Sequence, residues 1–225
     1  FIVNPCIFWI HYLNMKRRVF CKASASMILA WGLNPIIAFA NPNNQVLSGK
    51  IFVNKKLVKN NFENLGNVLI ETKKTKAILK IENDFYLVRP DTKLKFVSNQ
   101  LKEIIAGSVH AVFGKREEEL KIKIPQGTIG IRGTSIFVNL EPEKQRSYLC
   151  NCSGHTKLYD NSGKLLKSLI SKDHKPAVIT DSGEIENYSY NYLFNLYALR
   201  HASIFEKEMK EVGCVVKDSH CTFSS

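Results

Sequence analysis

Two cysteines separated by one residue, Cys150 and Cys152, are the side chains best suited to chemistry in this 225-residue chain. Residues i and i+2 of a β-strand point to the same face, so both sulfur atoms are expected on one side of a sheet. Their Cβ atoms should then be about 6–7 Å apart. A disulfide spans only about 3.5–4.5 Å between Cβ atoms, so we expect none within the pair. Two thiolates on one face are also good ligands for a soft metal.

Histidines accompany this pair. His155 follows Cys152 by three residues, and His174 lies near the next strand candidate. Zn²⁺ accepts such a Cys/His set and Cu(I) accepts the thiolates, although the spacing matches no standard zinc signature. The cofactor is therefore left unknown: none, zinc or copper.

Two more cysteines, Cys214 and Cys221, follow in a predicted loop, where they can bridge each other or reach back to the Cys150–Cys152 strand. Structural disulfides, a metal site and free thiols all stay open as interpretations. His110 and His201 are interpreted as surface or packing residues.

Short strands must position these side chains. Residues 44–180 alternate polar and apolar positions, as in Lys121–Ile124, with turn residues about every ten positions. The pattern predicts a mainly β fold: a sandwich, a roll or a solenoid-like sheet of short strands. The predicted strands are 45–53, 68–72, 76–81, 85–88, 94–97, 108–113, 120–124, 135–140, 146–152, 156–159, 165–171 and 177–180.

A helix is predicted after the strands, over residues 188–212, which contain neither Gly nor Pro. Its apolar residues recur every three or four positions, and Gly213 ends it. They are Leu193, Tyr197, Ile204, Phe205, Met209 and Val212. We expect this C-terminal amphipathic helix to pack on the β domain; binding a partner is the alternative.

The front of the chain resembles an export signal. Residues 15–40 have a basic start, a moderately apolar middle and an Ala-x-Ala end at Ala38 and Ala40. The residues Arg17, Arg18, Phe20 and Lys22 resemble a twin-arginine translocation signal; a Sec signal or a retained anchor is the alternative. Cleavage there gives a periplasmic mature chain without a membrane span. Residues 1–14 are interpreted as translation from upstream of the true start.

The charge is strongly basic, with 32 Lys and Arg against 20 Asp and Glu and a net charge of +12. The first forty residues contain four basic and no acidic side chains, which leaves +8 on the remainder. This surplus favours anionic partners in general. We expect an envelope protein or an anionic polymer as partner, and no nucleic acid.

Several segments in order resemble the FecR-type periplasmic domain. They begin at 49–54 and 65–72, continue through 77–94 and 105–109, and end in the most telling stretch, 127–138. That stretch contains the family's aliphatic-Arg-Gly-Thr turn that opens a strand, complete here at Ile131–Thr134. The residues singled out for this turn are Gly130, Arg132, Gly133 and Thr134. The resemblance covers about residues 45–160 and implies an all-β module.

The best-known FecR-type proteins relay a signal to a sigma factor across the inner membrane, and they need an anti-sigma segment and a spanning helix. Neither is found in this sequence, so we expect a stand-alone module. The resulting domains are the signal (15–40), a FecR-like β domain (41–182) and a helix with a cysteine-containing tail (183–225).

No nucleophile elbow, phosphate loop, zinc-protease motif or dinucleotide fingerprint is present, so we predict no catalysis. The leading interpretation is an exported, non-catalytic binding or scaffold module in the cell envelope, related to signalling. One alternative is a thiol-based metal or redox protein using Cys150 and Cys152. Another is a structural envelope component that binds anionic polymers.

Overall fold

A computed structural model provides the structure of this chain and describes residues 44–62, 66–186, 199–211, 214–217 and 220–223. The chain divides into two units, residues 1–40 and 41–225, and every described residue belongs to the second. Among these residues, no helix has both the length and the apolar composition needed to cross a bilayer. The predicted export signal lies outside the described residues.

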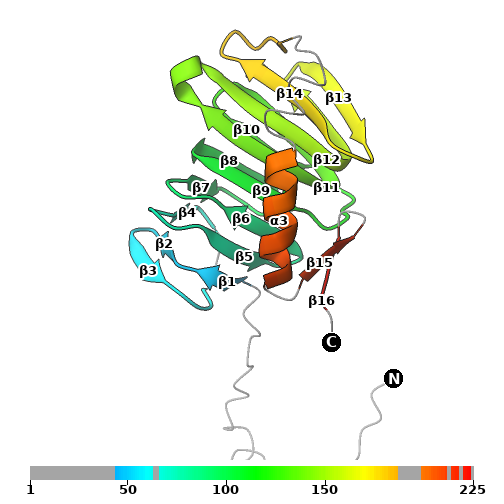
Figure 1. Ribbon diagram of the computed structural model, residues 1–225. Helices are drawn as coiled ribbons and strands as arrows, with labels where there is room; N and C mark the ends of the chain where they lie inside the picture. The colour runs from blue at the N-terminus through cyan, green and yellow to red at the C-terminus, as the bar shows by residue number, and fades with distance from the viewer. Residues whose placement is uncertain (1–43, 63–65, 187–198, 212–213, 218–219, 224–225) are drawn as a thin grey trace, which may run out of the picture. The chain divides into compact units, whose positions relative to one another are not determined.

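Strands dominate this unit and confirm the predicted mainly β class (Figure 1). They are β1 (Asn44–Gly49), β2 (Ile51–Val53), β3 (Lys56–Val58), β4 (Val68–Glu71), β5 (Ala77–Ile81), β6 (Asp84–Val88), β7 (Lys93–Phe96), β8 (Leu101–Ala106), β9 (Ser108–Val112), β10 (Leu120–Ile124), β11 (Gly127–Glu141), β12 (Arg146–Tyr159), β13 (Leu165–Ser171), β14 (Lys175–Thr180), β15 (Cys214–Lys217) and β16 (His220–Phe223). Within the described residues, the helices are α3 (Leu199–Glu211) and the short 3-10 turn η1 (Pro142–Lys144).

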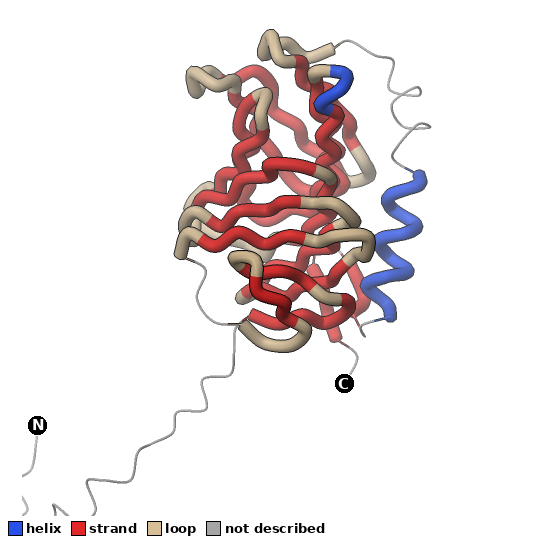
Figure 2. The backbone as a smooth tube through the Cα atoms, turned by 90° about the vertical axis from the view of Figure 1, so that its left-hand side faces the viewer, coloured by secondary structure: helices blue, strands red, loops and turns tan. Residues whose placement is uncertain are grey.

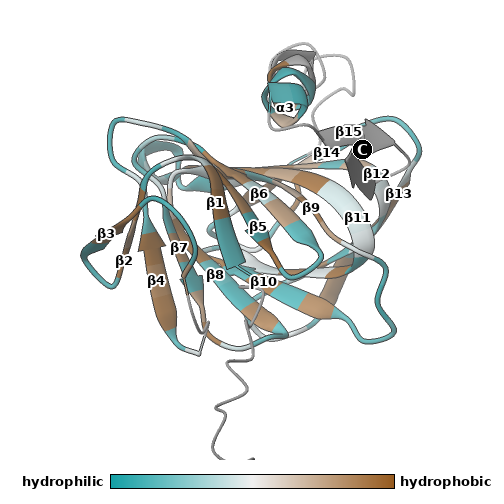
Figure 3. Cartoon of the chain, turned by 90° about the horizontal axis from the view of Figure 1, so that it is seen from below, coloured by the Kyte–Doolittle hydropathy of each residue, from teal (hydrophilic) through white to brown (hydrophobic). Residues whose placement is uncertain are grey.

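One 14-stranded sheet is organised around the long strand β11. The second half of β11 pairs with β9, which leads through β6 and β5 to β1. Its first half pairs with β10, which leads through β8, β7, β4 and β2 to β3. A bridge between Gln45 and Asn61 joins the far ends of the two arms. The sheet therefore curves into a nearly closed, barrel-like roll, as Figure 3 shows from below.

The inside of this roll is the hydrophobic core. It forms because apolar and polar residues alternate along the strands. In β10, Leu120, Ile122 and Ile124 are buried, whereas Lys121 and Lys123 are exposed. Because a strand alternates faces every residue, this pattern places one apolar face inward. The same cluster includes the inward residues of β5, β6, β9, β11 and β12.

The outer face of β5, β6 and β9 is also apolar, and helix α3 covers it (Figures 1 and 2). Phe205 and Met209 of α3 are buried there against Ile78, Phe85 and Leu87. The amphipathic helix is thus confirmed over 199–211; the rest of its predicted range, 188–198 and 212, lies outside the described residues. Packing on the β domain is the role that the structure supports.

Four sequence interpretations of the sheet were wrong. The predicted strand at 45–53 is two strands, β1 and β2, and these pair with different neighbours. The motif at 130–134 does not open a strand, because β11 runs without interruption from 127 to 141. The two predicted strands at 146–152 and 156–159 are one strand, β12. Strands β3, β8, β15 and β16 were not predicted, and the last two replace the predicted loop around Cys214 and Cys221.

Candidate functional site

Cys150 and Cys152 lie on the outer face of β12, as their spacing predicts. Leu149, which precedes Cys150 on β12, packs in the core, whereas both cysteines belong to an outer cluster with Phe137, Tyr148 and Val178. Their exposed fractions are 0% and 8%, and neither thiol takes part in a disulfide. The pair is therefore a buried dithiol with an apolar surround.

The loop between β13 and β14 brings His174 to this pair. The backbone N–H of His174 donates to the carbonyl of Cys152 at 3.0 Å, and its φ of 39° turns the chain there. Its ring Nδ1 lies 3.4 Å from Cys150 Sγ. The ligand atoms of Cys150, Cys152 and His174 all lie within 4.8 Å of one another. The structure thus brings together three of the predicted site residues.

His110 is a fourth member of this group, and sequence reasoning missed it. It lies on β9 directly opposite Phe137 of β11, whose other neighbour across the sheet is Cys150. Its Nε2 is 3.7 Å from Cys152 Sγ and 3.3 Å from Ser135 Oγ. A lone histidine carries no signal in the sequence, because its partner Cys152 is 42 residues away.

Burial controls the electrostatics of the group. Desolvation, followed by the neighbouring Cys150 thiol, raises the pKa of Cys152 well above its usual range. The hydrogen bond with Cys150 is the main reason why the pKa of His174 is raised. A thiol whose pKa is raised in this way is a poor nucleophile, because the thiolate is the reactive form.

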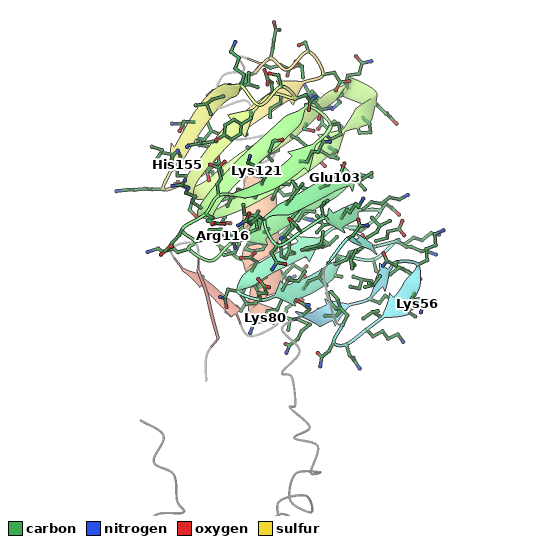
Figure 4. The ribbon with its side chains drawn as sticks, turned by 180° about the vertical axis from the view of Figure 1, so that it is seen from behind. Lys56, Lys80, Glu103, Arg116, Lys121 and His155 are labelled. Atoms are coloured by element: carbon green, nitrogen blue, oxygen red, sulfur yellow. The ribbon has the colours of Figure 1, made fainter. Side chains whose placement is uncertain are left out.

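The remaining predicted ligands lie elsewhere. His155 is exposed on β12 (Figure 4) and lies 2.7 Å from Ser168 Oγ rather than beside the cysteines. Cys214 faces Phe223 in the register of β15 and β16, and Cys221 faces Val216, so the two cysteines are not opposite each other. Disulfides involving Cys214 or Cys221 stay predictions.

The Arg-Gly-Thr segment forms a bulge inside β11, where the register with β12 shifts between Ile131 and Thr134. Gly133 has a φ of +97°, and a Cβ there would lie 2.8 Å from Lys115 Cα. The buried Thr134 hydroxyl lies 2.9 Å from Asn151 Oδ1 and also contacts the Ser153 carbonyl. The segment is a structural clasp between β11 and β12.

Gly130 and Arg132 contribute less to this clasp than Gly133 and Thr134 do. Gly130 has no left-handed φ, and a Cβ there would meet only the carboxylate at the end of the Glu119 side chain. Arg132 is exposed, and no hydrogen bond of its guanidinium is found among the described residues. Thr134 rather than Arg132 therefore binds the neighbouring carbonyl. The signal residues Arg17, Arg18, Phe20, Lys22, Ala38 and Ala40 lie outside the described part.

A second polar cluster forms around Asp84, the first residue of β6. Asp84 pairs with Arg116 at 2.5 Å, and the buried Lys102 donates to the carbonyls of Ser98 and Asn99 at 3.0 and 2.6 Å. Burial raises the pKa of Asp84 and lowers that of Lys102 to about 8. Asp84 and Arg116 neutralise each other, and Lys102 is hydrogen-bonded to the backbone of the loop before β8. We therefore interpret the cluster as structural.

Comparisons with known proteins add little to this geometry. No family model matches the chain, and neither does any curated protein. Two crystal structures that resemble it, at 2.50 Å and 1.65 Å resolution, are described as a proposed anti-sigma factor from Parabacteroides distasonis. The first is 13% identical with a TM-score of 0.46 and covers 64% of this chain and 73% of that chain. The second is 12% identical with a TM-score of 0.46 and covers 69% and 82%. Values this low assign neither a family nor an activity.

Proposed function

We propose that this chain is an exported, non-catalytic binding module of the FecR type, which works in the periplasm and docks a protein partner in signalling. Two sequence features support this role: the export signal predicted at 15–40, and the FecR-like segments, which follow one another along the chain in the order typical of that family. The observation that carries the docking is the exposed edge strand β13, at the margin of the sheet in Figure 1.

β13 has the properties of a strand that accepts another strand. Among the described residues it pairs with β12 alone. Its Leu165 and Ile170 are 50% and 68% exposed, which is unusual for large apolar side chains on a sheet edge. Edge strands are normally protected against pairing with other chains, and an extended segment can add to an open edge through main-chain hydrogen bonds.

The charge around β13 selects the partner. Lys164, Lys167 and Lys172 are all exposed along or beside the strand. A second copy of this chain would bring the same lysines together, and like charges across a strand pair are destabilising. An extended acidic segment of another protein is complementary instead.

Chemical cross-linking in intact cells, followed by fractionation, tests this proposal. Wild-type protein should be periplasmic, begin after Ala40 and form a discrete cross-linked species with another protein. The double variant Leu165→Glu/Ile170→Glu should lose that species, because it removes the apolar contacts and repels an acidic segment.

Leu57→Glu is the matched control, since Leu57 is 51% exposed on β3 at the other end of the sheet. It should retain the cross-linked species. The proposal fails if both variants keep or both lose the cross-linked species, or if the protein stays unprocessed in the cytoplasm. It also fails if the wild type cross-links to no protein and instead binds anionic polymer in a salt-sensitive way.

A further inference from the structure

We propose that Cys150, Cys152 and His174 form a binding site for one Zn²⁺ ion on the outer face of β12. This site goes beyond the partner docking proposed above and does not depend on it. The argument rests on the separation of the ligand atoms, on the charge of the donor set, and on the way in which the fold fixes each ligand.

The distances suit a zinc ion. Zinc binds thiolate sulfur at about 2.3 Å and imidazole nitrogen at about 2.0–2.1 Å, which places two tetrahedral ligand atoms about 3.5 Å apart. The distance from Cys150 Sγ to His174 Nδ1 is 3.4 Å. All three ligand atoms lie within 4.8 Å of one another, so small side-chain rotations bring them onto one ion.

The charge of the site favours zinc over Cu(I). Both thiols are almost completely buried beside Phe137, Tyr148 and Val178, where an uncompensated charge is costly. Two thiolates neutralise Zn²⁺, whereas they leave one negative charge around Cu(I). Binding converts two S–H groups into thiolates and releases both protons to solvent, with no change of oxidation state.

The backbone holds the ligands in place before a metal arrives. Cys150 is fixed by its pairing with Phe137 of β11 and Pro176 of β14. Cys152 lies where the register with β11 shifts, between two paired residues of β12, and its carbonyl accepts the backbone N–H of His174. His174 is fixed by its backbone hydrogen bond to Cys152, which is independent of its ring. Each ligand therefore loses little conformational freedom on binding.

His110 supplies the second imidazole of a four-ligand set. Structural zinc sites are usually tetrahedral, and Cys₂His₂ is one of the standard combinations. His110 Nε2 already lies 3.7 Å from Cys152 Sγ. A rotation toward Cys150 completes the set, and Ser135 Oγ, now 3.3 Å from the same nitrogen, would lose that contact.

Titration of the reduced, metal-free full chain with Co²⁺, followed by competition with Zn²⁺, tests the site. Wild-type protein should bind one equivalent and develop the absorption of cobalt–thiolate bonds. The double variant Cys150→Ser/Cys152→Ser should lose this absorption. Mutating a residue that only supports a metal ligand typically weakens binding by roughly 10–100-fold. His174→Asn removes a ligand itself, so it should weaken binding by at least that factor.

His174→Asn is chosen because it should fold. Asn tolerates the positive φ of this position, and the backbone hydrogen bond to Cys152 remains. Its thermal unfolding without metal should match that of the wild type. Two controls should bind like the wild type: His155→Asn, an exposed histidine on the same strand, and Cys214→Ser/Cys221→Ser.

Three results would overturn the inference. They are failure of the wild type to bind Zn²⁺, equal affinity in His174→Asn and the wild type, and loss of binding in Cys214→Ser/Cys221→Ser while Cys150→Ser/Cys152→Ser retains it. The last would place the ion at the C-terminal cysteines. None of these readouts depends on export or on partner docking, so this site and the proposed function fail separately.

Discussion

The ring of His110 on the sheet stacks on the ring of Phe205 in helix α3, with centroids 3.7 Å apart and planes 21° apart. This contact joins two features of the molecule. His110 lies beside Cys152, and Phe205 anchors α3 in the outer apolar cluster. Helix docking and the order of the Cys/His group are therefore connected through one pair of rings.

Phe205→Ala should loosen α3 without unfolding the sheet. The variant leaves a cavity among Ile78, Phe85 and Leu87, and a buried Phe→Ala change typically costs about 3–5 kcal/mol. Hydrogen exchange should show faster amide exchange across 199–211, with little change in β5 and β6. Lys207→Ala, at an exposed position of the same helix, should leave exchange unaltered. Uniform loss of protection throughout the sheet would contradict this view of α3.

Gly133→Ala should be more destabilising than Gly163→Ala. Both positions have a left-handed φ, +97° and +87°, so both variants bear the same backbone strain. Only at Gly133 does the new Cβ meet backbone, 2.8 Å from Lys115 Cα. Chemical denaturation should show an additional loss of about 1–3 kcal/mol at Gly133. Equal losses of stability in the two variants would mean that the close approach of Lys115 to Gly133 does not require a glycine there.

Thr134→Val tests the clasp between β11 and β12. Removing the hydroxyl takes away the donor that lies 2.9 Å from the buried Asn151 Oδ1, which should cost about 1–3 kcal/mol of unfolding free energy. Thr156→Val is a matched control on the same sheet, because Thr156 Oγ1 is buried with no hydrogen-bond partner among the described residues. The control should be neutral or stabilising. A similar loss in both variants would contradict the clasp.

Lys102 should make stability depend on pH. Burial lowers the pKa of its ammonium group to about 8, below the unfolded value, so the folded chain binds fewer protons than the unfolded chain above pH 8. Stability due to Lys102 therefore rises with pH between about 8 and 10.4, by up to about 1.4 kcal/mol per pH unit. Lys102→Met should lack this rise.

The measurement for Lys102 is the difference in unfolding free energy between the wild type and Lys102→Met across pH 8–10. Taking the difference cancels the other groups that titrate in this window, among them Cys152. The wild type should gain on the variant as the pH increases. A constant difference would show that Lys102 keeps an ordinary pKa.

Much of the fold could be predicted from local pattern. The alternation in β10 and the i, i+2 spacing of Cys150 and Cys152 follow from strand geometry, and both are found as expected. Strand β8 was missed because its buried Lys102 breaks the apolar alternation on which the prediction depends. The clasp was misread as a turn because two glycines suggest one, whereas Gly133 here forms a bulge.

The site was only partly predictable, because it depends on contacts across the sheet. His174 reaches Cys150 through the β13–β14 loop, and His110 reaches Cys152 through the order β9-β11-β12. Neither path can be read from local spacing. His155 is closer in sequence to the cysteines, yet it lies on an exposed part of β12. The sequence analysis named both histidines as candidates, and only His174 lies beside Cys150.

X-ray absorption at the zinc edge, on the reduced full chain loaded with one equivalent of zinc, tests the proposed centre most directly. Cys150, Cys152 and His174 predict two sulfur neighbours at about 2.3 Å, together with imidazole nitrogen at about 2.0–2.1 Å. A shell made of nitrogen and oxygen alone would contradict the site.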